Sequence, residues 1–355
     1  MEMTMRWYGS GYDTVTLKQI RQIRYVTGII TTLYDKLPGE LWTREEIHAL
    51  KEEVEAAGLH ISGIESVNVH DDIKTGKGER DLYIDSYIQT LENLGKEDIH
   101  LVCYNFMPVF DWTRTELARK RADGSTVLAY TQKAVDALDP KEMFASIRSD
   151  MNGTVMPGWE PERLAHVQEL FEMYRDVDAE RLFANLKYFL ERIMPVCNAY
   201  DIRMAIHPDD PAWSVFGLPR IITNKQNILR MMEMVDDVHN GVTFCSGSYG
   251  TDLNNDLPDM IRSMKGRIHF AHVRNLHFNA PDDFEEAAHL SHDGSFDMHA
   301  IMKALHDIGF NGPIRPDHGR MIWEEQAMPG YGLYDRALGA AYLCGLWEAI
   351  EKDEA

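Results

Sequence analysis

Cysteine is scarce in this sequence of 355 residues. The four cysteines show no CxxC spacing and lie in no short, disulfide-dense scaffold; they are Cys103, Cys197, Cys245 and Cys344. The amino terminus, MEMTMRWYGSGYDT, lacks the basic start and apolar core of an export signal, and no apolar run approaches the length of a membrane-spanning helix. We therefore expect reduced thiols in a cytoplasmic protein that is neither exported nor anchored in a membrane.

Positive charge is also limited. Asp and Glu together number 57 and Lys and Arg 36, so the formal net charge is -21. A surface that binds nucleic acid needs a basic footprint to neutralise phosphates, so nucleic acid and anionic membranes are poor candidates for partners. A small anionic substrate is compatible with this charge, because a local cation or a metal ion can outweigh a distant negative surface.

What the sequence does have is a regular alternation of short β-rich runs and longer amphipathic ones. The β-rich runs are MRWYG, YVTGIITTL, HISGIES, DIHLVCYNF, IRMAIHP, GVTFCSG, RIHFAHVRN and GPIRPDHG. Between them lie helical patterns such as TREEIHALKEEVEAAG, which begins with a Thr43 cap and an acidic first turn and ends at Gly58. This alternation predicts an α/β fold, a single (β/α)8 TIM barrel over residues 1–355. The alternative is an open doubly wound sheet, but no G-x-G-x-x-G sequence follows the first run.

The alternation is interrupted once, between about Asn105 and Pro161. This segment is too long for a plain loop and has its own helical pattern and its own Trp, Gly and Pro residues, which predicts an inserted helical segment after the fourth strand. Insertions at that position lie on the catalytic face of a barrel, so one interpretation is a lid or a wall of the substrate site. The other is a solvent-exposed or dimer-contacting excursion.

Four residues of metal-binding type share one structural position, the carboxyl end of a predicted strand. They are His207 in MAIHPDDP, Cys245 in TFCSGS, His272 in HFAHVRN and Asp317 in IRPDHGR. In a barrel these strand ends face one bowl, where two imidazoles, a thiolate and a carboxylate can hold a divalent ion. Each residue has an ordinary explanation, such as a buried thiol for Cys245 or a helix cap for Asp317. If none of the four residues were a metal ligand, four separate ordinary explanations would have to coincide at consecutive strand ends. The sequence therefore predicts a metal site.

Two histidines share the seventh predicted strand, His269 and His272. Residues an odd number apart in a strand point to opposite faces, so the two side chains cannot both face the bowl. His272 is nearer the following loop and is therefore the predicted ligand.

Candidate acid–base groups follow in the last part of the chain. His318 comes directly after Asp317, and an imidazole near a metal can act as a general acid or base around neutral pH. In MPGYGLYDR, Tyr331 stands between glycines before the last predicted helix. Its phenol either reaches the bowl or is an ordinary turn aromatic.

Further polar residues cluster at the same two strand ends as His272 and Asp317. Arginine pairs with a carboxylate through two parallel hydrogen bonds, so these residues are candidates for binding an anionic substrate. For Arg274 and Arg315 a structural salt bridge is the alternative. The candidates are Arg274, Asn275, Arg315 and Arg320.

Several longer motifs resemble one known family. IRPDHGR followed by PGYGLYDRALG, together with IHPDDPAW, TFCSGS, HVRN and the early ESVNVHDDIKTG, is similar to the D-mannonate dehydratases. The resemblance extends from MRWYG through the last predicted helix, which is essentially the whole chain. It implies a barrel of the xylose-isomerase-like type and a metal-dependent hydro-lyase of hexuronate catabolism that converts D-mannonate to 2-keto-3-deoxy-D-gluconate and water.

The resemblance also implies roles for individual residues. The metal ligands of the family fall on the four residues at the strand ends, and its proton-transfer groups correspond to His318 and Tyr331, with Tyr334 as the alternative for the second. The implied ion is Mn²⁺, with Fe²⁺ or Co²⁺ as substitutes, whereas the thiolate considered alone favours Zn²⁺ or Fe²⁺. A homodimer is implied as well.

The expected reaction is a β-elimination, in which a base removes the C2 proton and an acid protonates the departing C3 hydroxyl. A metal-dependent sugar isomerase or epimerase on the same barrel is an alternative, although a carboxylate-rich metal site is expected for it. A non-catalytic protein that binds a sugar acid or a metal is another, and it predicts binding without turnover. A phosphodiester-cleaving barrel enzyme is disfavoured by the acidic composition.

Overall fold

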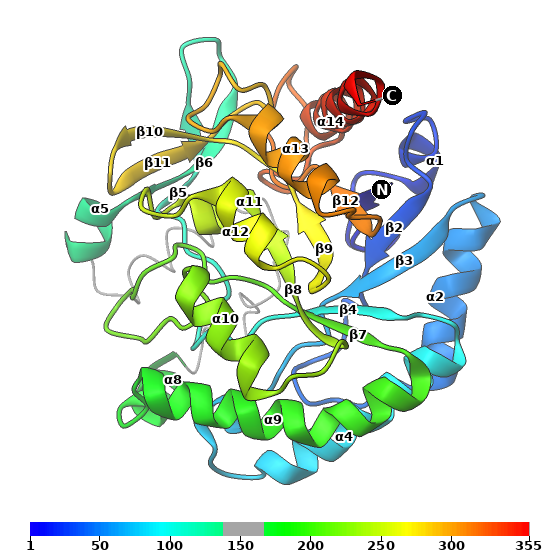
Figure 1. Ribbon diagram of the computed structural model, residues 1–355, viewed down its shortest axis with the longest axis vertical. Helices are drawn as coiled ribbons and strands as arrows, with labels where there is room; N and C mark the ends of the chain where they lie inside the picture. The colour runs from blue at the N-terminus through cyan, green and yellow to red at the C-terminus, as the bar shows by residue number, and fades with distance from the viewer. Residues whose placement is uncertain (138–166, 355) are drawn as a thin grey trace.

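The computed structural model describes residues 1–137 and 167–354. A closed barrel of parallel strands lies at its centre (Figure 1), in the order β1-β12-β9-β8-β7-β4-β3-β2. The barrel strands are β1 (Glu2–Arg6), β2 (Gly28–Thr31), β3 (His60–Glu65), β4 (Leu101–Tyr104), β7 (Arg203–Ile206), β8 (Asn240–Cys245), β9 (Ile268–His272) and β12 (Pro313–Arg315). Each overlaps one of the predicted β-rich runs, so the TIM barrel is confirmed and the open doubly wound sheet is wrong.

Most barrel strands are buried on both faces, which explains their nearly continuous apolar sequences. Every residue of β2, β4, β8 and β9 is buried, as expected for parallel strands inside a layer of helices. Inside the barrel Ile30, Cys103, Ala205 and Phe270 belong to one apolar cluster. Phe270 and His272 lie two positions apart on β9 and their rings are in contact, so this cluster forms the floor beneath the polar bowl.

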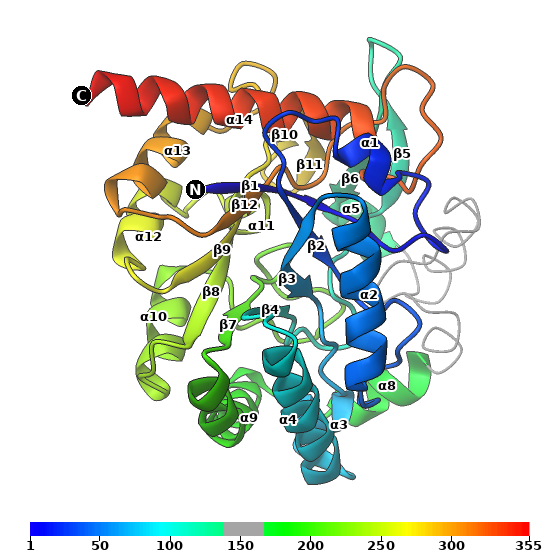
Figure 2. The ribbon, with the colours of Figure 1, turned by 90° about the vertical axis from the view of Figure 1, so that its right-hand side faces the viewer.

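Helices cover the outside of the barrel (Figures 1 and 2). The helices are α1 (Leu17–Ile20), α2 (Arg44–Ala56), α3 (Asp71–Thr75), α4 (Arg80–Lys96), α5 (Gln132–Ala137), α8 (Val167–Tyr174), α9 (Ala179–Tyr200), α10 (Lys225–Met234), α11 (Ser246–Gly250), α12 (Leu257–Ser263), α13 (Met298–Asp307) and α14 (Leu333–Asp353). In the part of the chain that the structure describes, none of them combines the length and apolarity needed to cross a membrane.

Helix α2 illustrates how local sequence sets these boundaries. The Thr43 side chain accepts a hydrogen bond from the backbone of Glu46, and the Glu46 side chain accepts one from the backbone of Thr43, which forms a capping box at the start. The buried residues Ile47, Leu50 and Val54 recur at helical spacing on the inner face. The segment stops at Gly58, whose φ of 74° favours glycine. The predicted start and end are confirmed.

A second sheet stands beside the carboxyl ends of the barrel strands, and we call it the accessory sheet. Its strand order is β10-β11-β6-β5, with antiparallel neighbours. The strands are β5 (Glu116–Lys120), β6 (Thr126–Thr131), β10 (Leu276–Ala280) and β11 (Asp283–Glu286). In Figure 2, β1 runs from the N-terminus on the left toward the side on which β5 and β6 lie.

The accessory sheet joins two segments that are far apart in the sequence. The hairpin β5–β6 follows β4, whereas β10–β11 follows β9, and β6 pairs with β11. The described part of the insertion therefore begins with two strands before the short helix α5, which the prediction of a helical segment missed. The remainder of the predicted insertion, residues 138–161, lies outside the described residues.

Candidate active site

A hollow opens at the carboxyl ends of the barrel strands, and we call it the bowl. It is bounded by the ends of the barrel strands and by the first residues after β4. The lining residues are Arg6, Tyr8, Glu65, Ser66, Asn105, Met107, Asp111, Trp112, His207, Asp210, Arg274, Arg315, Asp317, His318 and Tyr331. His269 is absent from this lining, in agreement with the alternation along β9.

The predicted metal ligands come together at one side of the bowl. One ligand atom from each of His207, Cys245 and His272 lies within 4.8 Å of the other two. Asp317 Oδ2 is 3.6 Å from the Cys245 sulfur and 3.9 Å from Nδ1 of His272. Strand register explains the meeting, because Cys245 of β8 pairs with His272 of β9, and His272 pairs with Arg315 of β12.

A neighbouring acceptor holds the imidazole of His207, and a carboxylate lies beside that of His272. Nδ1 of His207 lies 2.8 Å from the carbonyl oxygen of Pro208 and donates to it in the neutral ring, which leaves the lone pair on Nε2. Nε2 of His272 lies 3.5 Å from a carboxylate oxygen of Glu65, so Nδ1 is the nitrogen directed at the other ligands. Hydrogen bonding of the second ring nitrogen is the usual way in which proteins hold a metal-binding histidine.

The Cys245 sulfur is held at the start of α11. Ser248 donates to it twice, from the backbone nitrogen at 3.4 Å and from the hydroxyl at 3.1 Å. These donors stabilise negative charge on the sulfur, which a thiolate ligand requires. Gly247 keeps the turn close to Arg274, since an added Cβ would lie 2.2 Å from the guanidinium carbon. The small residues of the TFCSGS motif therefore bring the thiol and the arginine together.

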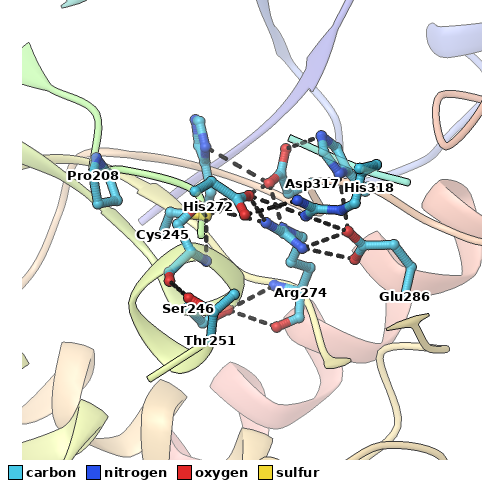
Figure 3. A network of polar contacts seen from close by, with 12 residues as sticks. Pro208, Cys245, Ser246, Thr251, His272, Arg274, Glu286, Asp317 and His318 are labelled. Carbon is cyan, nitrogen blue, oxygen red and sulfur yellow. Dashed lines mark hydrogen bonds and ion pairs between the residues drawn. The ribbon is translucent and has the colours of Figure 1, made fainter. Parts of the chain in front are cut away.

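Asp317 lies between two guanidinium groups, and Figure 3 shows the one that belongs to Arg274. Nε of Arg274 donates to Oδ2 at 2.8 Å, and Nη2 of Arg315 lies 2.9 Å from Oδ1. Burial alone raises the pKa of Asp317, but the neighbouring His318 and the arginines hold that pKa well below its usual range. The group is therefore an ionised carboxylate beside the Cys245 sulfur.

His318 and Tyr331 form a hydrogen-bonded pair next to this cluster. Nε2 of His318 is 2.8 Å from the Tyr331 hydroxyl, and both side chains are buried. Burial raises the pKa of Tyr331 well above its usual value, so the phenol keeps its proton. Tyr334 is 41% exposed and packs against Trp323 instead. Of the two tyrosines, the bowl contains only Tyr331.

Comparison with known proteins identifies the family of this chain. The family described as D-mannonate dehydratase (UxuA) matches residues 1–355. The chain belongs to the D-mannonate dehydratase family. The mannonate dehydratase of Brachyspira hyodysenteriae is 66% identical over 352 residues, covering 99% of each chain, and that of Thermotoga maritima is 56% identical over 354 residues, covering 99% of this chain and 98% of the other.

A comparison with solved structures also finds a mannonate dehydratase. The crystal structure of mannonate dehydratase from Streptococcus suis serotype 2 has a TM-score of 0.91 and 43% identity, covering 100% of this chain and 96% of that one. A xylose isomerase domain protein from Planctomyces limnophilus has a TM-score of 0.55 at 11% identity, covering 99% and 97% of the two chains, and shares the fold alone. The predicted dehydratase family and the hydro-lyase class are confirmed.

The four polar residues predicted to bind substrate in this dehydratase differ in what they contact. Asn275 donates to the carbonyl oxygen of Leu290 and accepts from the backbone of Phe296. Arg320 pairs with Asp335 and Asp123. Neither Asn275 nor Arg320 lines the bowl, so the geometry does not support a contact with substrate for either. Their side chains hold loops together, a role that their place in the sequence does not reveal.

Arg274 lines the bowl, but its donors are occupied. Besides Asp317 it contacts Glu286 at 2.6 and 2.8 Å and Asp210 at 2.7 Å. The structural salt bridge that the sequence left open therefore describes Arg274 best. Arg315 differs, since Nη2 contacts Glu65 and Asp317 while Nε and Nη1 are buried without a hydrogen-bond partner among the described residues.

Sequence reasoning missed the lining residues at the other strand ends of this dehydratase barrel. Arg6 and Glu65 end β1 and β3, and the rule that found the metal ligands applies to those strands as well. Asn105 and Trp112 show that the start of the insertion forms a wall of the bowl. Glu286 was missed because β11 itself was not predicted.

Proposed function

We propose that the bowl removes water from D-mannonate by a metal-dependent β-elimination that yields 2-keto-3-deoxy-D-gluconate in hexuronate catabolism. One observation carries the proposal: the same hollow is lined by the hydrogen-bonded pair of His318 and Tyr331 and by His207, whose ring nitrogen clusters with Cys245 and His272. An elimination requires a site where developing negative charge is stabilised and groups that move protons on the reacting carbons.

The donor atoms suit a divalent ion. Two imidazoles with lone pairs directed inward, a sulfur that accepts two hydrogen bonds and an ionised carboxylate make a basic ligand set. We propose Mn²⁺ as the ion, with Fe²⁺ or Co²⁺ as substitutes, following the family resemblance. When bound, such an ion would act as a Lewis acid that stabilises the negative charge formed as the C2 proton leaves.

The proton transfers are assigned to His318 and Tyr331. One of the two groups takes the C2 proton, the other protonates the departing C3 hydroxyl, and the enol that results tautomerises to the 2-keto acid. The raised pKa of Tyr331 supports the donor role for the phenol, because the proton is present throughout the neutral range. His318 then takes the C2 proton, and its Nε2 is the ring nitrogen on the side of Tyr331.

The substrate carboxylate is anionic and needs a cation with available donors. Arg315 supplies Nε and Nη1, which are buried without a partner among residues 1–137 and 167–354. Unpaired buried donors are costly, and an anionic substrate satisfies them. Arg6 lies across Glu65 from Arg315 and also lines the bowl. We assign these two arginines to the acidic end of the sugar acid.

Incubation of the protein with D-mannonate and Mn²⁺, followed by product analysis, tests the proposal. The expected product is a 2-keto-3-deoxy acid that forms in proportion to enzyme. An isomerised or epimerised sugar would support the alternative barrel activity, and tight binding without product would support a non-catalytic protein. Either outcome contradicts the dehydratase proposal for this chain.

We further propose a cytoplasmic homodimer. The four cysteines are free, which suits a reducing compartment, and the dimer follows from the family resemblance. Light scattering during size-exclusion chromatography measures the mass directly. A mass near 40.8 kDa, that of one chain, contradicts the dimer.

A further inference from the structure

A carboxylate from outside the barrel reaches His318. Glu286, the last residue of β11 in the accessory sheet, has Oε1 3.2 Å from Nδ1 of His318. The Glu286 side chain is completely buried. Figure 3 shows it on the far side of Arg274 from the Cys245 sulfur, with His318 beside it. His318 therefore has Tyr331 at one ring nitrogen and Glu286 at the other.

Two arginines keep Glu286 in place and charged. Nη1 of Arg274 donates to both carboxylate oxygens, at 2.6 and 2.8 Å, and Nη2 of Arg114 donates to Oε1 at 3.0 Å. Burial opposes ionisation of Glu286, but Arg274, together with His318 and Arg114, lowers its pKa to about 2. A carboxylate that is fully ionised can only accept hydrogen bonds.

This environment fixes the imidazole of His318. Since Glu286 only accepts, Nδ1 of His318 must carry the proton between them, and Nε2 is left to face the Tyr331 hydroxyl. The rings of Trp112 and Tyr331 meet the imidazole edge-on at centroid distances of 5.8 and 4.9 Å and restrict its rotation. A carboxylate behind a catalytic imidazole sets both its tautomer and its orientation.

The same network joins the two hairpins of the accessory sheet to the barrel. Arg114 lies just before β5 and also donates to both oxygens of Asp210, at 2.8 and 3.0 Å, near the end of β7. Arg274 follows the end of β9 and donates to the same Asp210 carboxylate. Glu286 thus sits at the junction of the accessory sheet and the bowl, in contact with guanidinium groups from two segments.

We propose that Glu286 is a positioning residue for His318, so that the accessory sheet contributes to the proton transfers through this one contact. This inference rests on the proposed function, because Glu286 acts only through His318. The competing explanation is purely structural: Glu286 neutralises Arg114 and Arg274 and stabilises the fold without affecting the chemistry.

The variant Glu286→Gln keeps the size and an acceptor but removes the charge. Since carboxylates behind such histidines contribute about 10- to 10⁴-fold, kcat should fall at least about tenfold, with little change in KM and in metal content. The matched control is Glu285→Gln. Its side chain points to the opposite face of β11 and pairs with Arg119 and Arg121. The control should keep the wild-type kcat.

A double substitution separates positioning from stability. In the His318→Asn background, Glu286→Gln should cause no further loss of kcat, because its target is already gone. An equal fractional loss with and without His318 would overturn the inference, as would a wild-type kcat in folded Glu286→Gln.

The conservative variant Glu286→Asp keeps the charge but shortens the reach, so kcat should lie between those of the wild type and Glu286→Gln. If Glu286→Gln does not fold, a wild-type kcat in folded Glu286→Asp overturns the inference. Failure of the proposed function is a different result: in that case the wild-type protein forms no keto acid. The inference alone fails when the wild type is active and His318→Asn is not, yet the Glu286 variants behave as the wild type.

Discussion

Nε2 of His207 lies 3.2 Å from Nδ1 of His272. Donation from Nδ1 of His207 to the Pro208 carbonyl leaves Nε2 as an acceptor, and the Glu65 carboxylate 3.5 Å from Nε2 of His272 favours the corresponding arrangement in that ring. Two lone pairs at this separation repel each other unless a cation lies beside both. The arrangement of this pair supports the proposal that both imidazoles are metal ligands.

Removal of the metal should destabilise the protein as well as inactivate it. A ligand that binds only the folded state at about 100 times its Kd adds about 2.7 kcal/mol of stability. Chelation should therefore lower the Tm by several degrees, and added Mn²⁺ should restore both the Tm and the activity. Thermal unfolding followed by fluorescence measures the change. An identical Tm with and without chelator speaks against a metal in the bowl.

The variant Cys245→Ala should lose most of its metal while the barrel stays folded. Altering an outer partner of a ligand costs about 10- to 100-fold in metal affinity, so loss of the ligand should cost at least as much. Metal content by mass spectrometry and far-UV circular dichroism give the two readouts. Cys344→Ala, in α14, is the control and should retain metal. Full activity in metal-depleted Cys245→Ala would remove Cys245 from the ligand set.

The two tyrosines near the last helix should respond differently to loss of the hydroxyl. Tyr331→Phe removes the group 2.8 Å from His318, and a general acid or base contributes about 10²- to 10⁴-fold. We therefore expect kcat to fall at least about 100-fold, with metal retained. Tyr334→Phe alters an exposed ring and should leave kcat unchanged. Equal kinetic effects in the two variants would contradict the assignment.

Gly247→Ala should disturb the bowl through sterics alone. The added methyl would lie 2.2 Å from the Arg274 guanidinium carbon, and overpacking of this kind costs about 1–3 kcal/mol. Displacement of Arg274 should also weaken its hydrogen bond to Asp317 and thereby lower the metal affinity of the site. Gly345→Ala, in the interior of α14 with open space around it, should stabilise by about 0.5–1 kcal/mol. Denaturant unfolding measures both, and a Gly247→Ala protein as stable and active as the wild type would refute the close approach.

The barrel and the proximity of the potential metal ligands could be predicted from the sequence, because both follow from the period of the apolar residues and from the position of each ligand at a strand end. Strands buried on two faces show as apolar runs, and the ends of parallel strands converge whatever lies between them. That is why His207, Cys245 and Asp317 were found together although they are far apart in the chain.

The remaining features of the site depend on tertiary contacts, which no local sequence pattern encodes. The partners of Arg274 are Glu286, Asp210 and Asp317, each brought to it by tertiary folding. Asn275 and Arg320 neighbour bowl residues in sequence, yet their side chains point elsewhere. The β5–β6 hairpin did carry a local signal, because Gly124 follows Asp123 between two runs and has a φ of 87°.

The pairing of β6 with β11 has a consequence for the order of events during synthesis. Thr131 pairs with Asp283, and β1 pairs with β12 at Pro313. Neither the accessory sheet nor the barrel can therefore be completed before the last quarter of the chain is synthesised. Until then a nascent chain carries the unpaired edges of β1 and β6, and such edges are prone to associate with other strands. We therefore expect these edges to be protected only once the final segments of the chain have been translated.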